Sequence, residues 1–163
     1  MFGWGMKRDA TVVETVCSRL RPLFLILEQR LGYLPPELRS DPYVIGYIIG
    51  GTTLFAQIET GGKPSRELVG LVCLTAIQRS LGRLNLTMLD ASHAMQAAAL
   101  HPDAKRGSRA AALSIGVAAG VPGLDSEPEV VAAKQSLANM PNSLREQLQG
   151  GLQAQLGDRK SVV

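Results

Sequence analysis

The sequence predicts an all-α protein: a compact bundle of about five to seven helices, followed by a weaker and more polar helical extension at the C-terminus. Apolar residues recur at spacings of three and four, which is typical of amphipathic helices. Cap residues, prolines and glycines stand where such segments begin and end. With 45% hydrophobic and 19% charged residues, the chain of 163 residues can form a real core. We expect residues 1–122 to form this core domain and residues 123–163 to form the extension.

The first predicted helix begins near Asp9 or Thr11 and ends at Gly32. Pro22 interrupts it, because its ring removes a backbone donor and clashes one turn back, so a kink or break is expected just before it. The apolar face of this helix comprises Val13, Val16, Cys17, Leu20, Phe24, Leu27 and Leu31.

The second predicted helix spans residues 43–60. Asp41 followed by Pro42 is typical of a helix start, and Gly61-Gly62 of a helix end. A hairpin is the competing interpretation, since residues 43–49 are rich in strand formers and Gly50-Gly51 suits a two-residue turn. We prefer the helix, because the punctuation and the length of the segment suit it better.

The remaining helices are predicted from Ser65 to Gly82, from about Leu86 to Leu100 and from Arg109 to Gly120. Two more polar helices follow, at 126–140 and 143–156. No aromatic residue lies beyond Phe55, so the second half must pack with smaller side chains that each bury less area.

Self-association as a homodimer is the leading functional prediction. Three segments (12–31, 43–58 and 68–81) are apolar over wide arcs, more than a small bundle needs to hide. Glycines four residues apart let two helices approach closely. The predicted interface residues are Gly46, Gly50 and Phe55.

Two other hypotheses concern the same segment. The uncharged stretch 42–58 has 17 residues, but a membrane-spanning helix needs about 20, so a buried core helix is the better interpretation. A ligand pocket or an enzymatic site in the bundle is the other alternative, since polar groups on an apolar helix can orient a ligand. Its lining residues would be Tyr43, Tyr47, Thr52, Thr53 and Glu59.

The sequence singles out no catalytic residue, no metal site and no cofactor. Asp90 and His93 have the helical spacing of an orienting pair, but such pairs are usually surface features. The two histidines and the two cysteines lack the spacing of a zinc site. Cys17 and Cys73 lie in apolar helical patterns and are predicted to be reduced core residues.

Nucleic-acid binding is not expected. The net charge is only +3 and neither half of the chain is a basic arm. The densest basic cluster, Lys105, Arg106 and Arg109, is interpreted as a solvated loop with Gly107 and Ser108. The first residues resemble no secretion signal, so a cytoplasmic location is expected. The sequence thus predicts a cytoplasmic, non-catalytic helical protein that acts by binding itself or a protein partner.

Overall fold

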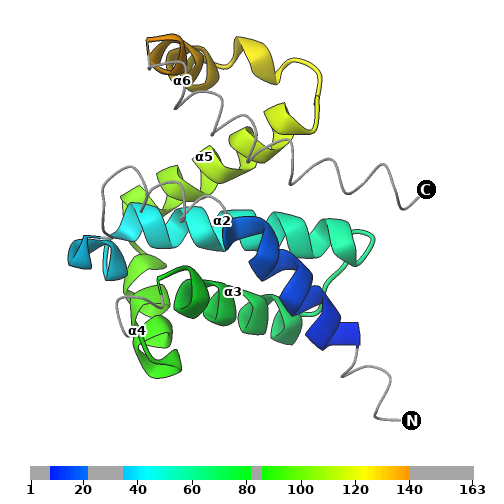
Figure 1. The fold of residues 1–163 in the computed structure, drawn as a ribbon, viewed down its shortest axis with the longest axis vertical. Coiled ribbons are helices and arrows are strands. Elements are labelled where there is room, and N and C mark those ends of the chain that lie inside the picture. Colours follow the sequence, from blue (N-terminus) through cyan, green and yellow to red (C-terminus); the bar gives the residue numbers. More distant parts are fainter. Residues whose placement is uncertain (1–7, 22–34, 82–85, 140–163) are drawn as a thin grey trace. The chain divides into compact units, whose positions relative to one another are not determined.

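The computed structural model describes residues 8–21, 35–81 and 86–139, and within these ranges every regular element is helical (Figure 1). This confirms the all-α prediction. The predicted helix at 143–156 lies outside the described residues. Pro22 does as well, and Leu20 and Arg21, where the kink or break was expected, are still helical. The elements are a helix over residues 8–21, the 3₁₀ turn η1 (Pro36–Arg39), α2 (Pro42–Glu59), α3 (Arg66–Ser80), α4 (Met88–Ala98), α5 (Pro102–Ala118), the 3₁₀ turn η3 (Leu124–Ser126) and α6 (Pro128–Ala138).

The segment that could have been a hairpin is one helix, α2. The carboxylate of Asp41 accepts a hydrogen bond from the backbone N–H of Val44 at 3.0 Å, which satisfies a donor of the first turn. Gly61 and Gly62 follow the helix with φ of 74° and 106°, a backbone region that glycine enters without steric penalty. The cap and the glycine stop therefore decide between the two interpretations.

The next two helices begin with side-chain caps. The hydroxyl of Ser65 accepts from the N–H of Leu68 at 3.1 Å before α3. Before α4, the Thr87 hydroxyl accepts from the N–H of Asp90 at 3.1 Å, and the Asp90 carboxylate accepts from the N–H of Thr87 at 2.9 Å. This reciprocal capping box fixes where α4 starts.

The fifth helix starts earlier than predicted, and the interpretation of the basic cluster as a loop was wrong. α5 begins at Pro102, so Lys105 and Arg106 are helical. Pro102 fits the first helical position, where a missing N–H does no harm. Asp103 lies in the first turn, and its N–H donates to Nδ1 of His101 at 3.2 Å. Gly107 suggested a loop, but it has a packing role inside the helix that is described below.

The chain divides into two compact units, Met1–Ala111 and Ala112–Val163, and the division falls within α5. In the first unit, α2 packs against both α3 and α4, which also pack against each other. In the second unit, Gly116 leaves room for the side chain of Leu124, and Val130 is buried. The core of the first unit contains, among others, Val13, Val16, Leu20, Ile45, Ile48, Phe55, Leu68, Val72, Ile77 and Leu81.

Candidate interaction surface

Two leucines of α4 and the turn after it point away from the protein. Leu89 is 65% exposed and Leu100 is 93% exposed. Between them lie His93 and Gln96, both exposed. Leu89, His93 and Gln96 follow one line along α4, and Leu100 continues the spacing of four, three and four in the turn after the helix. We call this line, Leu89–His93–Gln96–Leu100, the outer face of α4.

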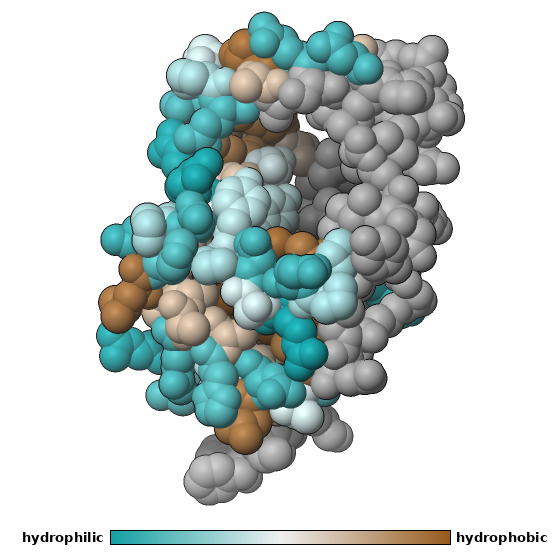
Figure 2. Space-filling view, turned by 90° about the vertical axis from the view of Figure 1, so that its left-hand side faces the viewer, coloured by the Kyte–Doolittle hydropathy of each residue, from teal (hydrophilic) through white to brown (hydrophobic). Residues whose placement is uncertain are grey.

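α4 differs from an ordinary amphipathic helix, because its buried residues are alanines while Leu89 is exposed. It turns Ala91 and Ala98 toward α2 and α3, where their exposed fractions are 0% and 2%. Small side chains at these two positions let α4 lie close to its two neighbours. Leu89, on the opposite side of the helix, is exposed. The space-filling view of the side on which α4 and η1 lie shows separate hydrophobic areas among hydrophilic ones (Figure 2).

The outer face of α4 contains no Asp, Glu, Lys or Arg. Between Leu86 and His101 the only Asp, Glu, Lys or Arg is Asp90. Its carboxylate is bound by Thr87, first through the backbone N–H and then through the hydroxyl, and these hydrogen bonds hold the pKa of Asp90 below its usual value. Asp90 thus serves the cap of α4.

Two of the predicted interface residues lie against α5 of the same chain. A Cβ atom on Gly46 would overlap the backbone of Ala104, and one on Gly50 would overlap Ser108. Gly107 makes the reciprocal approach, since a Cβ there would overlap the carbonyl oxygen of Tyr43. The glycine spacing does mark a close helix crossing, but the structure places that crossing within the chain.

The third predicted interface residue, Phe55, is a core residue. It is buried, and the guanidinium of Arg19 lies 5.4 Å from the centre of its ring. This distance is within the range of a cation–π interaction. Arg19 also forms a 2.5 Å ion pair with Glu59. Its Nη1 is buried and has no hydrogen-bond partner within the described ranges.

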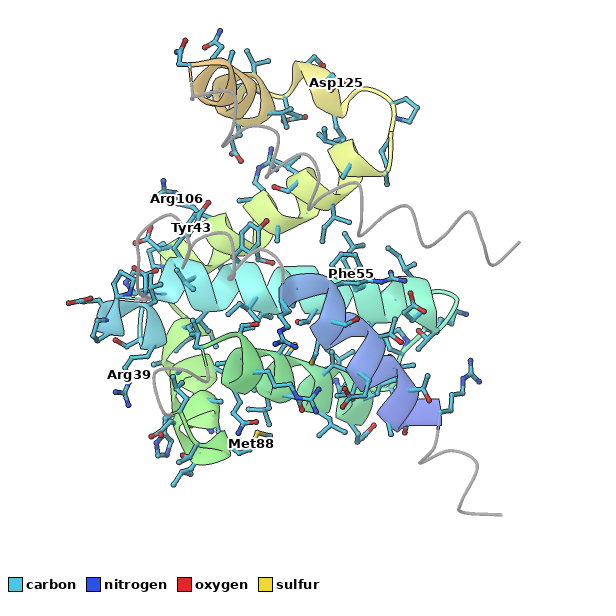
Figure 3. All side chains as sticks on the ribbon, in the orientation of Figure 1. Arg39, Tyr43, Phe55, Met88, Arg106 and Asp125 are labelled. Atoms are coloured by element: carbon cyan, nitrogen blue, oxygen red, sulfur yellow. The ribbon has the colours of Figure 1, made fainter. Side chains whose placement is uncertain are left out.

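The predicted pocket residues lie on different sides of α2. The backbone around Tyr43 and Tyr47 faces α5. Thr52 is nine residues beyond Tyr43, about two and a half turns, so it lies on the opposite side of the helix. Its hydroxyl is 3.2 Å from Sγ of Cys73 in α3. Figure 3 shows Tyr43 and Phe55 at separate places along the same helix. The structure brings Thr52 and Thr53 together at Cys73, and it pairs Glu59 with Arg19.

Both cysteines are buried thiols, as the prediction of free core residues requires. Burial raises the pKa of Cys17 and of Cys73 above the ordinary value of 9.0, chiefly because the thiolate would lose its hydration. The hydroxyl of Thr52 donates to the carbonyl of Ile48 at 2.7 Å, so this buried polar group is satisfied. These thiols remain protonated at neutral pH and are poor nucleophiles.

The basic residues of α5 are exposed on the helix. Arg106 forms a 2.9 Å ion pair with Asp103, three residues earlier, which offsets part of the local positive charge. Lys105 and Arg109 are exposed.

In the described ranges no group of three or more His, Cys, Asp or Glu side chains is placed to hold a metal ion. Among the same residues, no helix has both the length and the apolar character needed to cross a membrane.

Sequence reasoning missed the outer face of α4, because a leucine at helical spacing is normally assigned to the core. A signal was present: Ala91, Ala94 and Ala98 share one side of the helix, and the leucines share the other.

Compared with known proteins, the chain matches no family model, and no curated protein or solved structure is similar to it.

Proposed function

We propose that this chain is a non-catalytic helical protein that associates with a second copy of itself through the outer face of α4. The observation that carries the proposal is the pair of exposed leucines, Leu89 and Leu100, on a helix that buries alanines instead. Such an arrangement leaves apolar surface in water, which burial between subunits would remove.

The chemistry-bearing side chains support a structural role. Asp90 caps α4, Glu14 is bound by Arg79, and Glu59 is paired with Arg19. Cys17 and Cys73 are buried with raised pKa values. Each of these groups has a partner or a surrounding that explains its presence without a substrate.

The expected affinity is modest. An 11-residue helix such as α4 is about 16 Å long, so a single helix pair belongs to the small class of interfaces. Fully burying a leucine contributes about 1.5–3 kcal/mol. Four leucines meet in a twofold dimer, and part of their contribution offsets the entropy lost on association. We therefore expect dissociation constants in the micromolar range.

Light scattering over a range of concentrations tests the proposal directly. The mass should rise from 17.4 kDa toward twice that value as the concentration passes through the micromolar range. Leu89→Ser and Leu100→Ser should each weaken association at least about tenfold, since about 1.4 kcal/mol corresponds to a factor of ten. Both residues are exposed, so circular dichroism should show unchanged helicity.

Leu71→Ser is the matched control. Leu71 is also an exposed leucine, at 46%, but it lies on α3 rather than on the outer face of α4. The control variant should associate as the parent does. A mass that stays at 17.4 kDa at all concentrations would remove the proposal. Equal weakening by all three variants would indicate general loss of hydrophobicity and would also count against it.

The proposal includes a cytoplasmic location, which the unpaired state of Cys17 and Cys73 supports, since reducing compartments keep thiols free.

The pocket hypothesis stays a prediction, and the separation of Tyr43 from Thr52 on α2 does not favour it. If the parent chain remains monomeric, association with a different protein through the same face is the alternative that takes the place of self-association.

A further inference from the structure

We infer that two copies of α4 pair in an antiparallel arrangement about a twofold axis, with Leu89 opposite Leu100 of the partner subunit and His93 opposite Gln96 of the partner subunit. The inference rests on the proposed self-association and gives it a register. It follows from the spacing of the outer face of α4 and from its lack of acidic and permanently basic groups.

The sequence spacing of the four residues is the same in both directions, with three of them on α4 and Leu100 in the turn that follows Ala98. Leu89, His93, Gln96 and Leu100 are separated by four, three and four residues. When a second copy is reversed, its line of side chains therefore matches the first with the centre between residues 94 and 95. A twofold axis requires such self-complementarity, because the same patch meets itself.

The side chains that face each other across the two helices are chemically compatible. At the two ends, leucine meets leucine and buries apolar area. In the middle, the imidazole of His93 meets an amide, and the two groups can exchange one hydrogen bond because both carry a donor and an acceptor. A face without Asp, Glu, Lys or Arg adds no repulsion between like charges.

The antiparallel direction is favoured over the parallel one for two reasons. A parallel pair would place His93 opposite its own copy, so the pairing of imidazole with amide would be lost. It would also bring like ends of the helix dipoles together, whereas the antiparallel pair places each helix N-terminus beside the C-terminus of its partner. Both effects act at the outer face and need no change in the core.

Cross-linking in the full-length protein tests the register. Purified Leu89→Cys and Leu100→Cys chains are mixed in equal amounts at a concentration at which light scattering shows dimers. They are then oxidised with a dithiodipyridine and separated on a non-reducing gel. The native cysteines are buried, so the unsubstituted chain gives the background. The mixed sample should yield at least about ten times more covalent dimer than either variant alone.

The single-variant samples distinguish the two directions. In the antiparallel register, two copies of residue 89 lie about 16 Å apart along the axis, too far for a disulfide. Strong cross-linking of Leu89→Cys with itself would indicate a parallel pair and overturn the inference. If light scattering shows that the mixed variants form dimers but no sample cross-links above background, the register is wrong while self-association stands. If the parent protein is monomeric, the proposed function itself fails.

Discussion

Gly107 in α5 lies directly against the backbone carbonyl of Tyr43 in α2. Gly46 makes the matching approach from the other helix, against the backbone of Ala104. Backbone atoms cannot move aside as a side chain can, so these two positions hold the crossing of α2 and α5 at a separation that only glycine permits.

Substitution at this crossing should destabilise the protein. A methyl group in Gly107→Ala or Gly46→Ala must push the helices apart, and such overpacking costs about 1–3 kcal/mol, occasionally more. Urea denaturation followed by circular dichroism measures the loss. An unchanged midpoint for both variants would show that the crossing is loose, and that the glycines are available for another surface.

Gly70 provides the matched control in α3. A Cβ atom there would meet no atom within 4 Å, so the added methyl group has space. Alanine is the better helix former, and Gly70→Ala should therefore stabilise the protein by about 0.5–1 kcal/mol in the same denaturation experiment. A destabilised variant would indicate that the exposed side of α3 is covered by something else.

The thiols should be protected in the folded protein. Cys17 and Cys73 are 7% and 2% exposed, and the raised pKa of each further lowers the fraction of reactive thiolate. A colorimetric thiol reagent should label both only after denaturation. Since the unfolded thiols ionise first, the free energy of unfolding should also fall as the pH rises above about 9. Rapid labelling of native protein would contradict the core assignment.

Acid should weaken the link between the first helix and α3. The carboxylate of Glu14 accepts two hydrogen bonds from the guanidinium of Arg79, at 2.8 and 2.6 Å, and the pKa of Glu14 is lowered mainly by these bonds. The contribution is present above the ordinary pKa of 4.5 and is lost as the pH falls through the lowered value.

A double-mutant cycle isolates this contribution. The coupling between Glu14→Gln and Arg79→Gln, taken from urea midpoints, should be small at pH 7 because the pair is exposed. It should disappear at pH 2. A coupling that persists at pH 2 would show that the contact depends on hydrogen-bond geometry or packing rather than on charge.

Local signals in the sequence predicted most of the helices. Asp41 and Ser65 are cap residues in the sequence and accept the expected hydrogen bonds in the structure. Gly107 misled the prediction of α5, because a glycine within a helix is locally unfavourable and only the neighbouring helix explains it. A local sequence pattern contains no information about the contact between Gly107 and Tyr43.

The candidate site was less predictable than the fold. The spacing of Gly46 and Gly50 correctly marks a close helix contact, but spacing alone does not say whether the second helix belongs to the same chain. Leucine is a typical core residue, and the spacing of Leu89 and Leu100 does not distinguish them from core residues. Their exposure follows from Ala91 and Ala98 taking the inner side of α4, which depends on how close α2 and α3 lie.

The bond between Glu14 and Arg79 also has a consequence for the nascent chain. Arg79 follows Glu14 by 65 residues, so at ribosomal rates of about 5–20 residues per second it is synthesised about 3–13 s later. Helix formation itself takes about a microsecond or less. Val13, Val16 and Leu20, which are buried in the folded protein, are therefore synthesised seconds before α3 is complete. During translation the first helix thus has far more time than it needs to form before α3 can reach it.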